Sequence, residues 1–139
     1  MWWGICVGGG KKLNKLEKLF FDSWNEYSIE QEDEDYVFTE ENPIGDKGLI
    51  HGVVIGPYKV DFTYGDCVIE LDGHDYHKTK EQRDSDYKRE RYLQKLGYTV
   101  IRFTGTEVFL EPRKCIIDMI TINNLFEQKL IDAYCKGMN

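Results

Sequence analysis

The chain has 139 residues and a formal net charge of −7, and 41% of its residues are hydrophobic and 14% aromatic. These values predict one packed domain with its own core, and no apolar run approaches the length that spans a membrane. The start MWWGICVGGG lacks the basic residues of a secretory signal. The four cysteines are far apart and form no CxxC motif, which predicts reduced thiols in an intracellular, cytoplasmic protein without a zinc site.

The charges are unevenly distributed along the chain. The segment from Glu30 to Asp46 holds eight of the 25 acidic residues and no Lys or Arg. The segment from His77 to Lys95 holds seven Lys or Arg residues and four acidic ones. The acidic average therefore does not exclude a nucleic-acid partner, because basic residues gather in one region.

Residues 1–10 end in three glycines and are predicted to form a flexible tail, and residues 11–139 a single domain. Within that domain, Lys11–Tyr27 has the periodicity of an amphipathic helix. Glu17 lies beside the apolar stripe of this helix, where it either points outward into solvent or serves a site. The stripe consists of Leu13, Leu16, Phe20, Trp24 and Tyr27.

The acidic segment at residues 30–46 is predicted to be an insertion in the domain, with one short strand at Tyr36–Thr39 and turns at Asn42-Pro43 and Gly45-Asp46. A solvated loop is the preferred interpretation. Two alternatives stay open: the segment mimics phosphate and covers the basic region, or it binds a protein partner.

Gly48–Ile55 is predicted to be a strand that turns at Gly56-Pro57. Two further strands, Tyr58–Tyr64 and Cys67–Asp72, flank Gly65-Asp66, a sequence typical of a type II′ hairpin turn. Counting back from that turn places Asp61 opposite Glu70. Like charges that face each other destabilise a sheet, and a bound Mg²⁺ is the simplest compensation, although an exposed sheet edge is the alternative.

A helix over Lys78–Leu96 follows and ends at Gly97, which suits the left-handed position after a helix. Tyr98–Phe103 should then run parallel to Cys67–Asp72, because a helix connects the two strands. Glu111-Pro112 starts a last helix, whose predicted apolar face comprises Ile116, Ile117, Ile120 and Leu125. The element order predicts an α/β domain with a small mixed β-sheet flanked by helices.

Further polar residues are predicted to gather near the carboxylate pair. His77 follows Glu70 by seven residues and titrates near neutrality, so it could take or deliver a proton. The apolar stripe of Leu93 and Leu96 continues into Arg89, Asp86 and Gln82, which predicts a charged helix end that faces inward. Asp86 could then orient His77, and Glu17 could stand in the outer shell of the metal. Each of these residues could also be an ordinary surface residue, and Asp86 with Arg89 a simple helix pair.

These residues resemble a known superfamily. The order VDF, IELDGHDYH, D-x-x-R and YLQKLGYTVIRFTGTEV, from about Leu13 to Ile120, is similar to PD-(D/E)XK nucleases. The most similar branches are very-short-patch-repair endonucleases, EDxHD homing endonucleases and a related domain-of-unknown-function family. The resemblance implies a restriction-endonuclease-like core and Mg²⁺-dependent cleavage of DNA. It matches Glu17, Asp61, Glu70, His77 and Asp86 to the functional residues of the family, and Arg89, Arg102 and Phe103 to its D-x-x-R and IRF positions.

The chain departs from the family pattern at four places, one of which is a longer stretch between Glu17 and Asp61, with the surplus in the acidic segment. Asp72 stands where the wider superfamily has the lysine of its E-x-K motif. This departure places more weight on His77, or makes Asp72 an added acidic group. The zinc ligands of the patch-repair enzymes are missing, so mismatch recognition is not implied. Those enzymes also wedge aromatic rings into DNA just before the histidine, where this chain has one ring, Tyr76.

The sequence therefore predicts a metal-dependent DNA endonuclease. Asp61 and Glu70 hold Mg²⁺, for which Mn²⁺ can substitute, and His77, Asp86 and Glu17 assist. Basic residues at the helix start contact backbone phosphates or stabilise charge: Lys78, Lys80, Arg83 and Arg89. The alternative is a nuclease-fold DNA-binding module that does not cut. A homodimer and a place in a larger DNA-processing complex both stay open.

Overall fold

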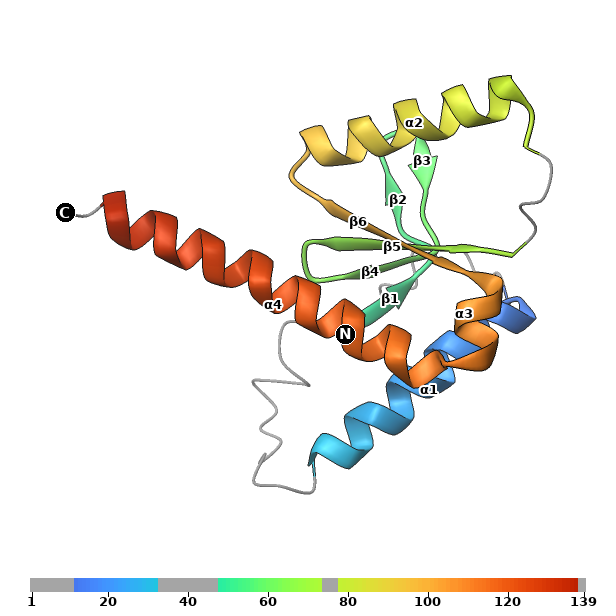
Figure 1. Ribbon diagram of the computed structural model, residues 1–139, viewed down its shortest axis with the longest axis horizontal. Helices are drawn as coiled ribbons and strands as arrows, with labels where there is room; N and C mark the ends of the chain where they lie inside the picture. Colours follow the sequence, from blue (N-terminus) through green and yellow to red (C-terminus); the bar gives the residue numbers. More distant parts are fainter. Residues whose placement is uncertain (1–11, 33–47, 74–77, 138–139) are drawn as a thin grey trace.

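The computed structural model describes residues 12–32, 48–73 and 78–137. A four-stranded mixed sheet lies at the centre, with the order β1-β4-β5-β6 (Figure 1). Four helices flank this sheet: α2 covers one face, and α1, α3 and α4 lie on the other. This is the small mixed α/β architecture that the sequence predicts. Within the described residues, no helix is long and apolar enough to cross a membrane.

The first helix, α1 (Lys15–Glu32), starts later and ends later than predicted. Asn14 begins it by a reciprocal pair of bonds: Glu17 N–H donates to Asn14 Oδ1 at 2.8 Å, and Asn14 N–H donates to Glu17 Oε2 at 3.1 Å. The predicted stripe is directed inward, with Phe20 and Trp24 buried. Its last turn includes Glu30 and Glu32, whereas residues 33–46 of the acidic segment, with the strand predicted at Tyr36–Thr39, lie outside the described residues.

The two long strands predicted for residues 48–64 form one hairpin, closed at Gly56-Pro57, that bends in its middle. The chain forms β1 (Leu49–His51), β2 (Val54–Ile55), β3 (Tyr58–Lys59) and β4 (Phe62–Tyr64), with β1 antiparallel to β4 and β2 antiparallel to β3. The break falls at Gly52, whose φ is 67°, and at the bend of Asp61. A glycine in the left-handed region bends the ribbon, so β2 and β3 leave the sheet toward α2 (Figure 1). Each predicted strand, Gly48–Ile55 and Tyr58–Tyr64, is therefore divided into two short strands. The pairing continues across the bend, where the Gly52 N–H donates to the Asp61 carbonyl oxygen at 2.9 Å.

The central hairpin has the predicted register. β5 (Cys67–Asp72) pairs with β4 so that Tyr64 is opposite Cys67 and Phe62 is opposite Ile69. Gly65, with a φ of 56°, supplies the conformation that the tight turn requires. The confirmed register fixes the face of every β5 side chain, since side chains alternate along a strand.

The second half of the fold follows the predicted crossover. β5 leads through α2 (Lys80–Lys95) to β6 (Thr99–Thr104), which is parallel to β5. Thr79 caps the start of α2. Gly97, with a φ of 95°, follows the end of this helix. A short helix that the sequence analysis missed, α3 (Gly105–Leu110), begins with a Thr104–Glu107 capping box.

The last helix, α4 (Pro112–Gly137), starts at the predicted proline. Its buried positions are Cys115, Ile116, Met119 and Asn123. The predicted apolar face of α4 is wrong at two residues, because Ile117 is 43% exposed and Leu125 is 59% exposed. Leu96, predicted to face the core from α2, is also exposed. In each of these three cases, the neighbouring described elements do not cover the side chain.

The core has two parts, one on each face of the sheet. The larger cluster joins α1, α3 and α4 to the sheet through residues such as Phe20, Phe62 and Ile69. The smaller cluster joins α2 to the bent hairpin through Val68 and Leu93. Alternation along β5 therefore directs Glu70, two residues after Val68, toward the α2 side.

Candidate active site

Asp61 and Glu70 are brought together where the hairpin of residues 49–64 bends beside β5. Strand pairing stops at Phe62 and Ile69, one residue short of the predicted pair. The two carboxyl groups are nevertheless hydrogen-bond partners. Asp61 Oδ2 also accepts the Leu71 backbone N–H at 2.8 Å, which holds the carboxyl group beside β5. The predicted juxtaposition is thus present, formed by side chains at a bend.

The surroundings of the pair disfavour two negative charges. Burial raises the pKa of Glu70 to about 7, Arg89 partly opposes this rise, and the charge of Asp61 adds to it. Burial also raises the pKa of Asp61. The hydrogen bond from the Leu71 N–H lowers this pKa, and the charge of Glu17 raises it further. Near neutral pH the pair therefore favours a shared proton. Oxygen ligands that repel each other in a buried place fit a hard divalent cation, which would remove this repulsion.

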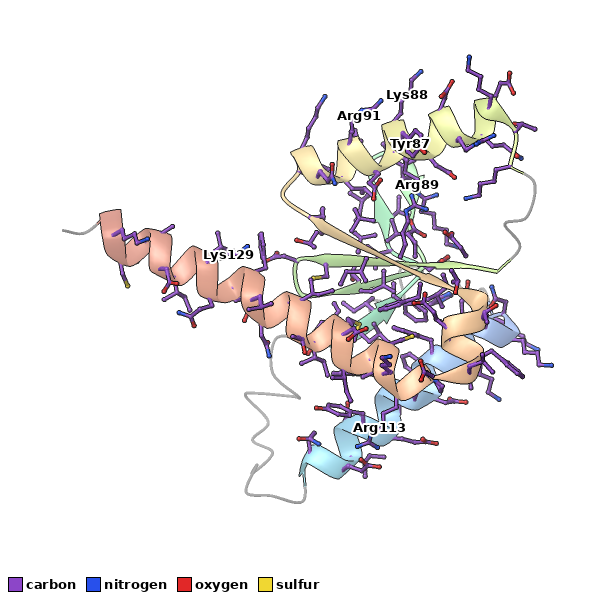
Figure 2. All side chains as sticks on the ribbon, viewed as in Figure 1. Tyr87, Lys88, Arg89, Arg91, Arg113 and Lys129 are labelled. Atoms are coloured by element: carbon purple, nitrogen blue, oxygen red, sulfur yellow. The ribbon has the colours of Figure 1, made fainter. Side chains whose placement is uncertain are left out.

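Arg89 of α2 is the cation with the larger electrostatic effect on Glu70, and Arg102 of β6 has a smaller one. The guanidinium of Arg89 forms an ion pair with Glu70, and Nη2 also donates to the Lys59 carbonyl oxygen at 2.6 Å. The guanidinium carbon lies 5.8 Å from the centre of the Tyr58 ring, and Nε is buried without a hydrogen-bond partner. Figure 2 shows Arg89 on the sheet side of α2, with Lys88 and Arg91 on the outer side. The prediction of an inward charged stripe is confirmed for Arg89.

Glu17 connects the start of α1 to the same region. Besides capping α1, its Oε2 lies 2.9 Å from His51 Nε2, and its charge raises the pKa of Asp61. The His51 ring packs at 5.2 Å from the Phe62 ring. The sequence analysis missed His51. Counting strand pairs back from the Gly56-Pro57 turn would have found it, because this count places His51 opposite Phe62, next to Asp61.

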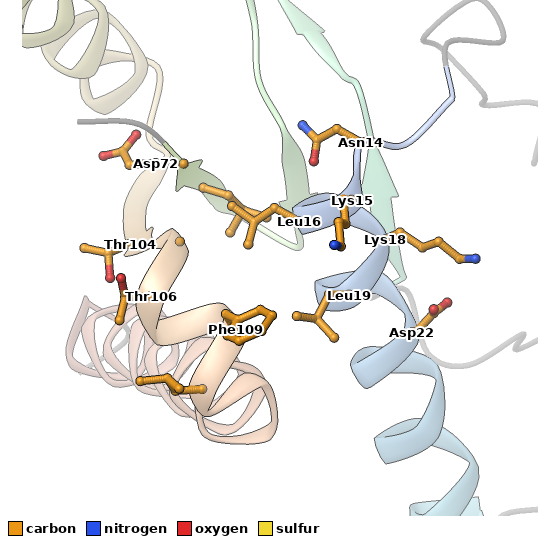
Figure 3. Close-up of a pocket in the computed structure, with 14 residues that line it drawn as sticks. Asn14, Lys15, Leu16, Lys18, Leu19, Asp22, Asp72, Thr104, Thr106 and Phe109 are labelled. Atoms are coloured by element: carbon orange, nitrogen blue, oxygen red, sulfur yellow. The ribbon is translucent and has the colours of Figure 1, made fainter. Parts of the chain in front are cut away.

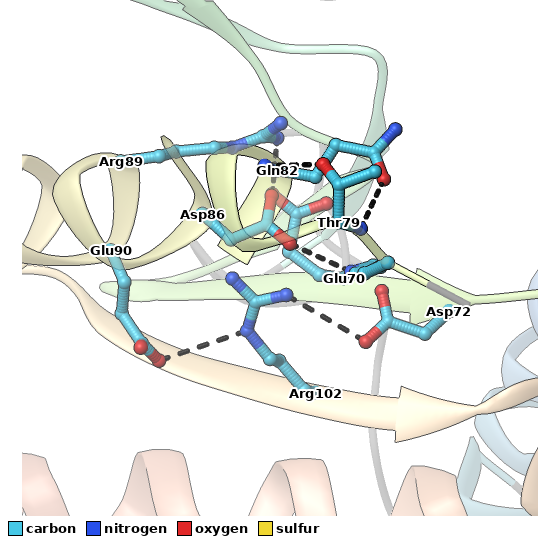
Figure 4. Close-up of polar contacts among 9 residues, drawn as sticks. Glu70, Asp72, Thr79, Gln82, Asp86, Arg89, Glu90 and Arg102 are labelled. Atoms are coloured by element: carbon cyan, nitrogen blue, oxygen red, sulfur yellow. Dashed lines mark hydrogen bonds and ion pairs between the residues drawn. The ribbon is translucent and has the colours of Figure 1, made fainter. Parts of the chain in front are cut away.

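Asp86 and Lys78 form an ion pair at the start of α2. Lys78 Nζ lies 2.7 Å from Asp86 Oδ2 (Figure 4). Asp86 and Arg89 thus bind different partners, and they do not form the simple helix pair that the sequence left open. His77 and Tyr76 lie outside the described residues, so their roles stay predictions. Lys80 and Arg83 are exposed on the first turns of α2.

A second network lies along β6. Arg102 Nη1 is 3.7 Å from Asp72 Oδ2, and Arg102 Nε is 3.8 Å from Glu90 Oε1 (Figure 4). Asp72, which stands in the place of the superfamily lysine, is therefore accompanied by an arginine from the neighbouring strand. Its charge is thus partly compensated within the fold.

Across the described parts of the chain, no group of three or more His, Cys, Asp or Glu side chains could hold a metal ion. The Asp61–Glu70 pair would supply two oxygen ligands. Mg²⁺ is commonly held by one or two carboxylates and keeps several of its waters, so a pair fits this ion. It does not fit zinc, which favours three or four protein ligands.

Comparisons with known proteins place this site in a family. The sequence profile of the REase_MTES_1575 family matches residues 45–122, more than half of the chain and the part that holds Asp61, Glu70 and Arg89. No curated protein sequence matches significantly. The solved structure of the homing endonuclease I-Bth0305I catalytic domain is similar, with 15% identity and a TM-score of 0.45 over 85% of this chain and 92% of that one. The profile match carries the assignment: the chain belongs to the REase_MTES_1575 family of restriction endonuclease-like proteins, within the PD-(D/E)XK-like nuclease superfamily.

Proposed function

We propose that this protein is a metal-dependent DNA endonuclease that hydrolyses a phosphodiester bond at the Asp61–Glu70 pair. The observation that carries the proposal is the contact of these two buried carboxyl groups, each with a raised pKa, within a nuclease family. Asp61 and Glu70 would hold Mg²⁺, or Mn²⁺ in its place. When bound, this ion would activate a water molecule and neutralise charge that develops on the phosphate.

The other side chains would prepare the pair and receive the DNA. The Leu71 N–H fixes the orientation of Asp61, and Glu17 adds negative charge beside it. Arg89 compensates the charge of Glu70 and stands where it could also stabilise a phosphate. Exposed basic residues at the start of α2 would contact the DNA backbone: Lys80 and Arg83, with Lys78 beside Asp86.

Proton transfer is assigned to His77 as a proposal from its place in the chain. Hydrolysis requires that the attacking water lose a proton and that the leaving oxygen gain one. Asp86, at the start of α2, would orient His77 or its water. The exchange of the superfamily lysine for Asp72 supports a histidine in this role, because Asp72 cannot donate a proton in its charged form.

Asp61→Asn and Glu70→Gln test this function. Each change keeps the size of the side chain and removes a metal-binding charge, so we expect plasmid nicking with Mg²⁺ to fall by about 100-fold or more. Asp118→Asn, which changes an exposed carboxylate on α4, is the matched control and should cleave like the native chain. Cleavage that survives both site changes would refute the mechanism.

The alternative, a DNA-binding module that does not cut, makes a different prediction. Calorimetric titration would then detect DNA binding without binding of Mg²⁺ or Mn²⁺. Binding of the ion that is lost in Glu70→Gln and kept in Asp118→Asn would support the endonuclease instead.

A further inference from the structure

An open groove of about 1120 Å³ lies between α1 and α3 (Figure 3). It is located at the carboxyl ends of the two parallel strands, where β5 ends at Asp72 and β6 at Thr104. Crevices at this edge of parallel strands are the usual ligand sites of open α/β sheets. The groove is also large enough for a ligand of nucleoside size, since typical ligand pockets measure about 300 to 1,000 Å³.

The walls of the groove are largely apolar and open to solvent. Phe109 and Leu110 of α3 are each 68% exposed, and Leu16 and Leu19 line the opposite wall on α1. Figure 3 shows the Phe109 ring directed across the groove toward Leu19. An aromatic ring exposed in a hollow is unusual for a residue that serves packing alone, and such rings commonly mark a binding surface.

Basic side chains stand along the α1 rim. Lys15 and Lys18 line the groove and are exposed, whereas Asp22 is the acidic residue farther along the helix (Figure 3). The other acidic residue of the lining, Asp72, is accompanied by Arg102 at 3.7 Å. The end of the groove nearest the sheet therefore combines an apolar wall with two lysines that form no ion pair with another described residue. That combination suits a ligand with a flat apolar part and a phosphate.

The groove adjoins the candidate active site through the backbone. Leu71 lines the groove, follows Glu70 directly, and donates its N–H to Asp61 at 2.8 Å. On α1, Leu16 lines the groove and Glu17 follows it. Leu71 and Glu70 face opposite sides of β5, so the groove and the carboxylate pair lie on opposite faces at the same end of this strand. A DNA strand that passes around this end would place a phosphate at the pair and a neighbouring nucleotide at the groove.

We propose that this groove binds an unpaired nucleotide next to the phosphodiester that is cleaved, so that the substrate is DNA with a flap or a single-stranded segment. The base would stack on Phe109, and Lys15 and Lys18 would contact the adjoining phosphates. A paired base cannot enter, because both of its faces are covered by its neighbours in the duplex. This inference rests on the proposed function for the position of the cleaved bond.

Binding without a divalent cation tests the groove separately from cleavage. Fluorescence anisotropy in EDTA would compare a fully paired duplex with the same duplex carrying a short single-stranded flap. We expect the native chain to prefer the flap DNA by about 10-fold. Phe109→Ala should weaken binding of the flap DNA by about 5-fold to 100-fold, since stacking contributes about 1 to 3 kcal/mol per base. The same change should leave the affinity for the paired duplex unchanged.

Matched variants make the result specific. Tyr134→Ala removes an aromatic ring that is 71% exposed on α4, away from the groove, and should keep the preference. Phe109→Trp retains a stacking surface and should also keep it, while Lys18→Ala should weaken flap binding and reduce its salt dependence. Circular dichroism melting checks that Phe109→Ala is folded.

Equal affinity of the native chain for both DNAs, or a preference that persists in Phe109→Ala, would overturn the proposal, and an apolar peptide segment would then be the better occupant. Because no cation is present, these outcomes do not depend on catalysis. If Asp61→Asn still cleaves, the proposed function fails while the flap preference is judged on its own.

Discussion

Glu70 shows at the scale of a single residue how this fold places a charge in an unfavourable environment. The residue lies on β5, one of the two inner strands of the sheet, and only 10% of its side chain is exposed. An ordinary structural position on β5 would hold an apolar residue, as Val68 does on the same face. Arg89 offsets part of the cost of burial, yet the pKa of Glu70 is still raised to about 7. Retaining a carboxyl group there is consistent with a binding role.

The raised pKa predicts how stability depends on pH in the metal-free protein. Between the ordinary value of 4.5 and about 7, folded Glu70 holds a proton that the unfolded chain has released. The folded state then binds more protons, so the free energy of unfolding should fall as the pH rises through this window, by on the order of 1 to 3 kcal/mol. Urea denaturation in EDTA at several pH values measures this change.

Glu70→Gln should flatten that pH dependence, because the amide does not titrate. Glu111→Gln alters an exposed carboxylate and should follow the native profile. Stability that rises across the window, or a fall of equal size in Glu70→Gln, would contradict the assignment to Glu70.

At the scale of elements, glycines with positive φ decide how the hairpins are placed. Gly52 bends the ribbon beside Asp61, and Gly65 closes the turn that sets the β4–β5 register. Gly65 also packs against the body: a Cβ at this position would lie 2.8 Å from Asn123 Oδ1. Asn123 is fully buried on α4. The turn therefore fixes both the register of the carboxylates and the fit of the sheet against α4.

Gly65→Ala and Gly97→Ala separate the cost of backbone strain from the cost of the contact with Asn123. Both glycines have positive φ, but a Cβ at Gly97 would meet nothing within 4 Å. Gly97→Ala should cost about 1 to 2 kcal/mol of unfolding free energy from backbone strain alone. Gly65→Ala should cost about 1 to 3 kcal/mol more, because Asn123 must move. Urea denaturation measures both, and equal losses would show that contact with Asn123 is unimportant.

At the scale of the whole molecule, α4 divides into a half that belongs to the core and a half that projects beyond the sheet (Figure 1). Met119 is fully buried, whereas Leu130 and Ile131 are 53% and 55% exposed. Glu30 and Arg113 join α1 to the first turn of α4 by an ion pair of 2.6 Å at the surface. The described domain is thus held together by the first half of the helix.

Substitutions on the two halves should differ accordingly. Met119→Ala removes a core side chain and should lower the unfolding free energy by about 2 to 5 kcal/mol. Leu130→Ala should change it by no more than about 0.5 kcal/mol, because the side chain loses little contact. Thermal denaturation of both variants, repeated at several protein concentrations, provides the test. A large, concentration-dependent loss in Leu130→Ala would indicate that a second copy covers this half.

The sequence by itself determined the local elements and part of the site. Alternation of apolar residues and the Gly65-Asp66 turn predicted β5 and its register, since both depend on residues close in the chain. The crossover predicted the parallel pairing of β5 and β6, and Pro112 the start of α4. The contact of Asp61 with Glu70 followed from the same count along the hairpin.

Only the tertiary structure decided what depends on contacts between distant segments. The bend at Gly52 divides two strands that look continuous in sequence, because alternation does not reveal where a ribbon leaves its sheet. Periodicity gave an apolar face to α4 but could not show that its partner surface ends before Leu125. The pairings of Arg89 with Glu70 and of His51 with Glu17 join residues 19 and 34 positions apart. Such contacts are set by how helices pack on the sheet. Local patterns could show that Arg89 faces inward and that His51 lies near Asp61, but not which side chain each of them meets.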